Sequence, residues 1–400
     1  MTGGAGGEAG ASGAAGSPAT ADRPRDGGPG PHPPGSTIGI LGGGQLGRMT
    51  ALAAARLGYR CHVYSPEADG PGAQVAAEST VAAYGDASAL GRFARAVDVV
   101  TFEFENVPAA TLDTLTAAVP CRPGVRALAV CQDRVREKGF LAEAGVPVAP
   151  WAEVAREEDL PAALAAVGLP AVLKTTRMGY DGRGQAVVAS VEAARAAFPE
   201  LLPHPLIAEA FVPFVAEVSA VAARGADGSV AAYDATENRH RGGILDLSFA
   251  PARVPGPVAA AARDHAARVA AGLELVGVVA VEFFLLADGT LLGNEIAPRP
   301  HNSGHWTMDA CAVSQFEQHA RAVAGLPLGD PGRHADAVMR NLVGPEGMAR
   351  WPFLVANRGV APHLYGKAAA RAGRKMGHVT RLLPRGTLEG TGEATLLANL

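Results

Sequence analysis

The segment that most constrains the fold is a short apolar strand that runs directly into a glycine-rich turn. Residues 37–41 read Thr-Ile-Gly-Ile-Leu and residues 42–47 read Gly-Gly-Gly-Gln-Leu-Gly. The run to Leu57 then has helical composition, with Gly58 at the position of a helix C-terminal glycine. Further strand patterns follow at 61–64 and 98–102. Strand, glycine turn, helix and strand in this order predict a doubly wound parallel sheet.

The glycines of the turn at 42–47 also fit the GxGxxG pattern of dinucleotide-binding proteins. Small residues let the backbone approach a phosphate, and the helix N-terminus favours negative charge. The dinucleotide pattern needs an acidic residue at the end of the second strand, where this chain has Tyr64 and Ser65. The turn therefore favours an anion site for another ligand over a nicotinamide cofactor. A tight turn in close helix–sheet packing is the alternative.

Composition narrows the class of partner. Over 400 residues, 35 basic and 39 acidic side chains give a net charge of −4, which offers no general footprint for nucleic acid or an anionic membrane surface. No stretch approaches the roughly 18 apolar residues of a membrane span. The four cysteines show no CxxC spacing, so they are expected to be reduced thiols in a cytoplasmic protein.

Residues 1–35 are a separate case. They contain 11 Gly and 6 Pro, which resist helix and strand alike. They also lack the apolar block of a signal peptide. We expect a disordered extension or the product of an upstream start codon. The length of the chain predicts two or three domains.

A strand ending in Lys174 is followed by a polar, glycine-rich loop at 179–185. A lysine at a strand end is a point cation suited to phosphate oxygens, and such a loop can close over a nucleotide and exclude water. The chain has no GxxxxGK[ST] motif, so this is not the loop of a P-loop NTPase. A solvated hairpin is the alternative.

Two glutamates lie within apolar strand patterns, Glu282 in 278–286 and Glu295 in 291–295. A hairpin at 287–290 would bring them across from each other. Two carboxylates inside apolar strands repel each other unless a cation neutralises them, and Mg²⁺ prefers hard oxygen ligands shared with phosphates. The pair predicts a magnesium site, and the alternative is that both side chains face solvent.

Two further polar clusters follow. Residues 297–306 place Arg299, His301, Asn302, Ser303 and His305 directly after Glu295, a density suited to a small anionic substrate. A basic cluster, either a phosphate clamp or a solvated face, comprises Lys367, Arg371, Arg374, Lys375 and His378. A helix is expected from Asp309 to Ala324.

Taken in order, Lys174, the loop 179–185 and the carboxylate pair resemble an ATP-grasp ligase. The segments 44–49 (GQLGRM), 179–185 (GYDGRGQ), 294–306 (NEIAPRPHNSGHW) and 373–378 (GRKMGH) narrow the resemblance to the N5-carboxyaminoimidazole ribonucleotide synthetases. The resemblance covers about residues 37–380. It implies a mixed α/β and α+β ATP-grasp fold, with an N-terminal parallel-sheet (pre-ATP-grasp) domain at 36–130, an ATP-grasp domain at 131–330 and a small mixed β domain at 331–400.

The resemblance also implies roles for individual residues. The expected ATP-binding residues are Arg134, Lys174, Gly179, Tyr180, Asp181, Gly182, Arg183, Gly184, Gln185, Glu209, Ala210, Phe211, Val212, Glu217, His240, Asn294 and Glu295. Glu282 and Glu295 are expected to hold Mg²⁺. The ribonucleotide is expected at Gln45, Leu46, Tyr180, Asp181, Arg374 and Lys375. The expected catalytic residues are Arg299, His301, Asn302 and Lys367.

The activity implied is ATP- and bicarbonate-dependent carboxylation of 5-aminoimidazole ribonucleotide at N5 through carboxyphosphate, in purine biosynthesis, by a homodimer that binds neither nucleic acid nor membrane. A formate-dependent ribonucleotide transformylase of the same superfamily is the nearest alternative. A nicotinamide oxidoreductase would leave the loop and the carboxylate pair unexplained. A regulatory nucleotide-binding protein on this fold would bind ATP without turnover.

Overall fold

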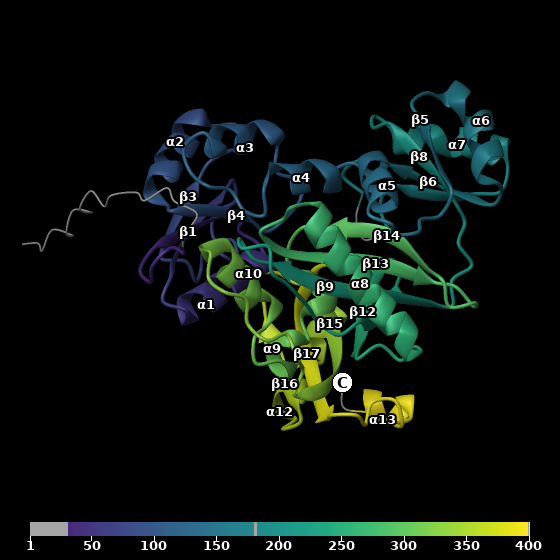
Figure 1. The fold of residues 1–400 in the computed structure, drawn as a ribbon. Helices are drawn as coiled ribbons and strands as arrows, with labels where there is room; N and C mark the ends of the chain where they lie inside the picture. Colours follow the sequence, from purple (N-terminus) through teal and green to yellow (C-terminus); the bar gives the residue numbers. More distant parts are fainter. Residues whose placement is uncertain (1–30, 180–181, 399) are drawn as a thin grey trace, which may run out of the picture.

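The computed structural model describes residues 31–179, 182–398 and 400, and within these ranges the strands form three sheets (Figure 1). A parallel sheet lies at the N-terminal end, a small antiparallel sheet lies at the far side, and a large antiparallel sheet joins them (Figure 1). Tyr180 and Asp181, expected to bind ATP and the ribonucleotide, lie outside the described residues.

The first sheet has the predicted doubly wound form, with four parallel strands in the order β3-β2-β1-β4. Its strands are β1 (Thr37–Leu41), β2 (Arg60–Ser65), β3 (Glu78–Val81) and β4 (Val99–Phe102). One face is covered by α1 (Gln45–Arg56) and by α10 (Gln315–Ala324), a helix from much later in the chain. The other face is covered by α2 (Ala87–Ala96) and α3 (Ala109–Thr116). Helices on both faces bury all four residues of β4, as expected for a parallel strand.

The small antiparallel sheet has the order β5-β8-β6-β7 and is packed on one side by two helices. Its strands are β5 (Trp151–Val154), β6 (Ala171–Thr175), β7 (Gln185–Val188) and β8 (Leu206–Ala210). Its helices are α6 (Leu160–Val167) and α7 (Val191–Leu201), with a 3₁₀ turn η1 (Glu157–Asp159) before α6. Before this sheet come α4 (Val125–Cys131) and α5 (Arg134–Glu143). Asp133 caps α5 by accepting hydrogen bonds from the amides of Val135 and Arg136.

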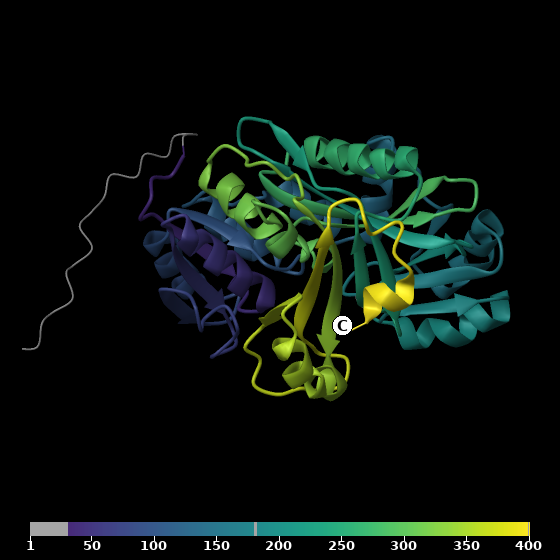
Figure 2. The same cartoon turned by 90° about the horizontal axis from the view of Figure 1, so that it is seen from below.

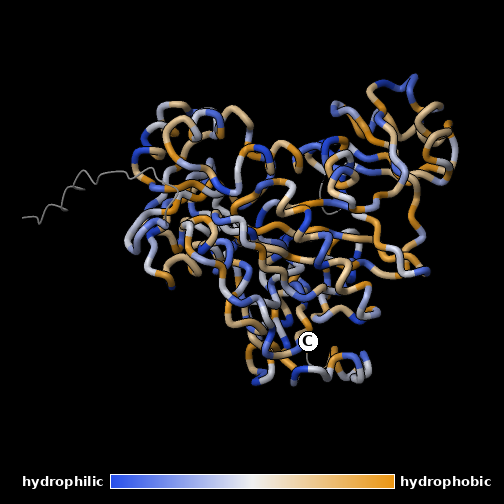
Figure 3. Tube along the Cα trace, in the orientation of Figure 1, coloured by the Kyte–Doolittle hydropathy of each residue, from blue (hydrophilic) through white to orange (hydrophobic). Residues whose placement is uncertain are grey.

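The large sheet has the order β14-β13-β9-β11-β12-β15-β17-β16, and β10 pairs with β9. Its first strands are β9 (Ala216–Arg224), β10 (Val230–Ala232), β11 (Thr236–Arg241), β12 (Ile244–Ala250), β13 (Gly277–Leu285) and β14 (Leu291–Ala297). Helix α8 (Gly256–Gly272) packs against β9 and β13 and closes one core (Figure 2). β9 and β13 carry long hydrophobic stretches, as the orange segments at the centre of Figure 3 show.

The C-terminal strands continue this sheet. β15 (Ala335–Val343), β16 (Val360–Leu364) and β17 (Lys375–Pro384) join through pairing of β12 with β15. Around them lie α9 (Thr307–Ala310), α11 (Gly344–Ala349), α12 (Trp351–Ala356) and α13 (Glu393–Leu397), whereas the 3₁₀ turn η2 (Asn302–Gly304) contacts β9, β11 and β12. The residues assigned to a small domain at 331–400 therefore share backbone hydrogen bonds with the central sheet.

Two local expectations need correction. The helix expected from Asp309 to Ala324 is two helices, α9 and α10. They are separate because the backbone of Cys311 pairs with that of Arg333 in an isolated antiparallel β-bridge, and Ser314 caps the start of α10. The extension expected over 1–35 ends earlier. The amide of His32 donates to Ala324 (2.8 Å), and its carbonyl accepts from the Tyr59 hydroxyl (2.7 Å), so these last residues are tied to the first sheet.

Candidate active site

A cavity of about 640 Å³ gathers residues from the large and the small antiparallel sheets and from the segments that follow β1 and β4 of the parallel sheet. The expected site residues that line it are Gln45, Leu46, Arg134, Lys174, Gly179, Gly182, Arg183, Gln185, Glu209, Ala210, Phe211, Val212, Glu217, His240, Glu282, Asn294, Glu295, Arg299, His301, Asn302 and Lys375. Gly184, Lys367 and Arg374 are not among the lining residues. The tertiary structure thus brings together most of the positions singled out in the sequence.

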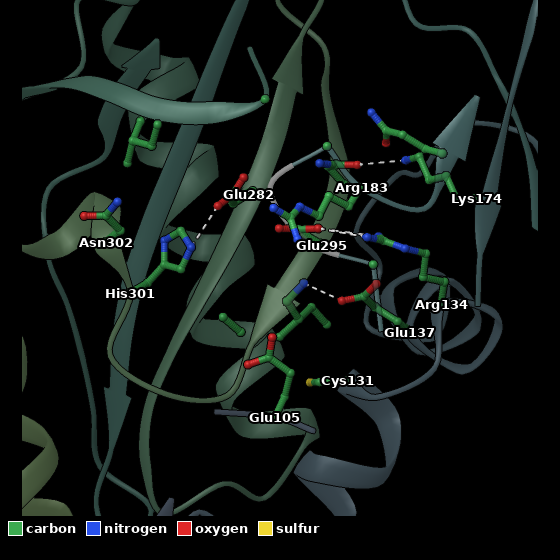
Figure 4. A pocket seen from close by; sticks show the side chains of 18 of the residues that line it. Glu105, Cys131, Arg134, Glu137, Lys174, Arg183, Glu282, Glu295, His301 and Asn302 are labelled. Atoms are coloured by element: carbon green, nitrogen blue, oxygen red, sulfur yellow. Dashed lines mark hydrogen bonds and ion pairs between the residues drawn. The ribbon is translucent and has the colours of Figure 1, made fainter. Parts of the chain in front are cut away.

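Glu282 and Glu295 lie directly opposite each other on β13 and β14, as the hairpin predicted (Figure 4). The register shifts after Glu282, so that Phe283 pairs with Gly293 and Asn294 is an extra residue in β14. A bulge of this kind can turn two successive side chains toward the same side. Asn294 and Glu295 both line the cavity. The alternative in which the carboxylates face bulk solvent is therefore wrong.

Each carboxylate of the pair has a separate partner side chain. His301 Nε2 lies 3.0 Å from Oε1 of Glu282, and Arg134 lies 3.4 Å from Oε2 of Glu295 (Figure 4). Burial acts to raise the pKa of Glu282, but the charge and hydrogen bond of His301, with His240 and Lys375 further away, outweigh it and lower the pKa to about 2. Glu282 is therefore held as an anion.

A buried network surrounds Lys174. Its Nζ donates to Oε2 of Glu209 at 3.0 Å and approaches the side-chain oxygen of Asn294 at 3.5 Å. Lys138 Nζ lies 3.2 Å from the same Glu209 oxygen. Burial acts to raise the pKa of Glu209, but Lys138 and Lys174 overcome this and lower it to about 2. Glu209, expected beside the adenine, thus also neutralises two lysines.

The sequence analysis missed Lys138 and Glu137. Both side chains are buried, with Lys138 only 1% and Glu137 only 3% exposed. Helical spacing could have revealed them in the sequence, because residues three and four positions after Arg134 share its face of α5. Charged side chains are seldom fully buried unless they have partners, so this face must contact polar groups.

The glycine-rich turn holds a carboxylate of the chain itself. Glu103, just after β4, accepts hydrogen bonds from the amides of Gly44 and Gly47, the latter at 2.7 Å. A Cβ atom on Gly44 would lie 2.6 Å from Glu103 Oε1, so glycine there makes room for this side chain. Burial raises the pKa of Glu103 even though both amides favour the charged form. The expectation of an open anion site at these amides is therefore wrong in this structure.

The segment after Glu295 divides into two parts. Arg299 donates to Glu105 through Nε (2.5 Å) and Nη2 (3.1 Å), and both residues line the cavity. Both side-chain polar atoms of Asn302 are buried without a hydrogen-bond partner in the described part of the chain. Buried polar groups normally have partners, so Asn302 is suited to contact a bound ligand. By contrast, Trp306 is core and donates to Thr236 at 3.0 Å.

An aromatic wall flanks the other end of the cavity. Phe214 stacks on Phe284, with ring centroids 4.7 Å apart, and Phe211 also lines the cavity. His240 Nδ1 lies 2.7 Å from Glu217. Burial acts to lower the pKa of His240, but Glu217 and the nearby carboxylates raise it. An apolar wall next to a polar pair suits a flat heterocycle with an attached sugar.

The basic cluster reaches the cavity through Lys375, and His378 is fully buried. Lys375 lines the cavity, and the Lys367 ammonium donates to the Lys375 carbonyl at 2.8 Å. Lys367 is also close enough to Glu103 for its charge to oppose the rise of that carboxyl's pKa. Arg374 donates to the carbonyl of Ala369 at 3.0 Å.

Comparison with known families matches three successive parts of the chain. The ribonucleotide synthetase preATP-grasp domain matches residues 36–132, the ATP-grasp domain matches 139–316, and the phosphoribosylaminoimidazole carboxylase C-terminal domain matches 337–386. The expected ATP-grasp fold with these three parts is confirmed.

Individual relatives are similar over most of their length. The N5-carboxyaminoimidazole ribonucleotide synthase of Brucella melitensis is 53% identical over 354 residues, which is 88% of this chain and 98% of the relative. An ADP complex of such a synthetase shares 44% identity with a TM-score of 0.84, covering 87% of this chain and 93% of the other. The Aspergillus clavatus synthase, solved with ADP and 5-aminoimidazole ribonucleotide, shares 30% identity with a TM-score of 0.84, covering 92% and 98%. The chain belongs to the N5-carboxyaminoimidazole ribonucleotide synthase family of ATP-grasp ligases.

Proposed function

We propose that this protein carboxylates N5 of 5-aminoimidazole ribonucleotide with bicarbonate and ATP, giving ADP, phosphate and N5-carboxyaminoimidazole ribonucleotide in de novo purine biosynthesis. The observation that carries the proposal is one cavity that joins Lys174 and the carboxylate pair to Arg299, His301 and Asn302. The first group suits a nucleotide triphosphate and the second a small anion. Relatives of the same fold were solved with ADP and with the ribonucleotide.

The chemistry has three steps. A bicarbonate oxygen attacks the γ-phosphorus and the bond to ADP breaks, giving carboxyphosphate. The carbon–oxygen bond of carboxyphosphate then breaks to release CO₂ and phosphate. Finally the nitrogen lone pair of the amine attacks CO₂, and the new N–C bond forms with loss of a proton. The protein's contribution is to place these groups side by side and exclude water, because carboxyphosphate is short-lived in water.

We assign residues to the substrates from the family resemblance and, for those residues that line the cavity, also from their place in it. The phosphates of ATP meet Arg134, Lys174 and the loop 179–185, and the adenosine part meets residues 209–212, Glu217 and His240. Arg299, His301 and Asn302 meet bicarbonate or carboxyphosphate. Lys367, which donates to the carbonyl of Lys375, is assigned with them. The ribonucleotide is assigned to Gln45, Leu46, Tyr180, Asp181, Arg374 and Lys375.

Mg²⁺ is the metal that these residues fit. Glu282 and Glu295 in register, with the amide oxygen of Asn294, form a set of hard oxygen donors in one cavity. Bound there, Mg²⁺ would neutralise charge on the ATP phosphate oxygens. Both carboxylates are oriented by the protein itself, because His301 contacts Glu282 and Arg134 contacts Glu295.

The deciding experiment is phosphate release from ATP by the purified protein with Mg²⁺, with and without the ribonucleotide, in bicarbonate-supplied and bicarbonate-depleted buffer. We expect turnover that requires the ribonucleotide and falls when bicarbonate is removed. Turnover indifferent to bicarbonate but supported by formate with another ribonucleotide would instead indicate the transformylase. ATP binding without turnover would indicate a regulatory protein.

The protein is further proposed to be a cytoplasmic homodimer. The cytoplasmic assignment rests on four free cysteines, and the dimer rests on resemblance to the family. No helix in the described part of the chain is long and apolar enough to cross a membrane. Light scattering coupled to size exclusion tests the dimer, and a mass near the 40.6 kDa of one chain would contradict it.

A further inference from the structure

One face of helix α5 contacts four consecutive residues of β14. Arg134, Glu137 and Lys138 occupy positions i, i+3 and i+4 and therefore share that face. Their side chains bond or pair with the segment 293–296 of β14 and with Glu209. This segment contains the bulge that turns Asn294 and Glu295 into the cavity.

Lys138 supplies two hydrogen bonds to the bulge. Its Nζ lies 2.9 Å from the carbonyl oxygen of Asn294 and 3.3 Å from that of Gly293. A bulge interrupts the regular ladder and leaves backbone groups without strand partners, and an unpaired buried carbonyl is costly. Lys138 meets that need from the helix, and its contact with Glu209 links the bulge to strand β8.

Glu137 contacts the strand just after the bulge, at Ile296. Its Oε1 accepts a hydrogen bond from the Ile296 amide at 2.5 Å. Burial, aided by the charge of Glu295, raises the pKa of Glu137 to about 8, although Arg134 and Lys138 oppose this. An accepting oxygen is what the Ile296 amide requires, and a neutral side chain that keeps such an oxygen can meet the same need.

We propose that Lys138 and Glu137 are positioning residues that fix the bulge at 293–296, so that Asn294 and Glu295 present their oxygens together toward the phosphate end of the cavity. Neither side chain has to touch a substrate for this role. The consequence for catalysis rests on the proposed function, because it assumes that Asn294 and Glu295 meet the metal–nucleotide complex. The positioning itself does not rest on it.

The activity test compares Lys138→Met with Arg136→Met, a matched control at an exposed position of the same helix. We expect Lys138→Met to lower kcat/KM about 10- to 100-fold, as loss of a residue that orients metal ligands typically does. The Mg²⁺ concentration for half-maximal rate should rise at saturating ATP, and Arg136→Met should match the wild type. Unchanged Mg²⁺ dependence in a folded Lys138→Met protein would overturn the proposal.

Hydrogen exchange of the protein without ligands gives a readout independent of activity. The peptide covering 291–297 should exchange faster in Lys138→Met than in the wild type and in Arg136→Met. Equal protection in all three would overturn the positioning role. A wild type inactive in the phosphate-release assay would count against the proposed function alone, since hydrogen exchange would still decide whether Lys138 and Glu137, here called the clamp, fix the bulge.

A second pair of variants tests the same clamp should Lys138→Met not fold. Glu137→Gln keeps an accepting oxygen for Ile296, and Glu137→Met does not. We expect Glu137→Gln to stay within a few-fold of wild-type activity and protection, and Glu137→Met to lose both. Equal behaviour of the two variants would overturn the role assigned to Glu137.

Discussion

Glu282 and Glu295 face each other across the β13–β14 hairpin, and each contacts a side chain from a different part of the chain. His301 comes from the segment after β14, and Arg134 comes from α5. The two carboxylates are therefore oriented separately, and Glu282, whose pKa is lowered to about 2, stays charged.

Glu295→Ala should abolish turnover with little change in the unfolding of the ligand-free protein. The side chain is 40% exposed, and Arg134, which loses this partner, keeps the charges of Glu137 and Glu209 nearby. Loss of a ligand that stabilises charge in the transition state by several kcal/mol corresponds to a fall in kcat/KM of about 100-fold or more. Steady-state kinetics and thermal unfolding check this. A collapse of the fold would mean that the carboxylate is structural.

Lys375→Ala should mainly raise the KM for the ribonucleotide. A hydrogen bond to a charged group contributes about 1.5–3 kcal/mol, which corresponds to roughly 10- to 100-fold in KM. The measurement is an initial-rate series in which each substrate is varied in turn. A defect confined to ATP would contradict the assignment of Lys375 to the ribonucleotide.

Glu103→Ala should destabilise the protein and create an anion site. Without this carboxylate the amides of Gly44 and Gly47 lose their acceptor at the N-terminus of α1. Unsatisfied donors there cost about 1–3 kcal/mol and attract an external anion. Sulfate should therefore raise the melting temperature of the variant more than that of the wild type. Identical sulfate effects would show that Glu103 does not fill the turn.

Stability should fall as pH drops from about 4.5 toward 2, in part because of Glu209. Its folded-state pKa of about 2 lies below the ordinary value of 4.5, so in this window the unfolded chain binds more protons than the folded one. The stabilisation is fully present above the unfolded pKa and is lost on acidification through the folded pKa. Glu209→Gln should be less stable at neutral pH, because Lys138 and Lys174 lose their partner, and should show a shallower loss in acid. Urea unfolding across this pH range measures both slopes, and parallel curves would contradict the assignment.

Local pattern was sufficient for several features. The strand–turn–helix at 37–57 and the pairing of Glu282 with Glu295 both follow from short-range rules, namely the periodicity of apolar residues and a tight turn. The cap of α5 at Asp133 follows in the same way. Motif resemblance added the order of the nucleotide-binding segments and the family.

Other features depend on contacts between distant residues. Glu105 and Arg299 are 194 residues apart, and Lys138 and Asn294 are 156 apart, so no local pattern links them. A signal was present for Glu103 and Glu105, because acidic residues directly after a parallel strand lie at the edge of the sheet where ligands bind. This signal did not reveal that the Glu103 carboxylate would accept hydrogen bonds from the amides of the glycine turn.

The sequence by itself determined several of the elements, the family and about half of the residues that line the cavity, because these depend on local periodicity and on motifs that keep their order along the chain. Only the tertiary structure decided which charges neutralise one another. Glu209 lies between two lysines, Arg299 pairs with Glu105, and the β12–β15 pairing joins the C-terminal strands to the central sheet. The physical reason is that a buried charge is stable only beside its partner, and the partner is brought there by the packing of all three sheets.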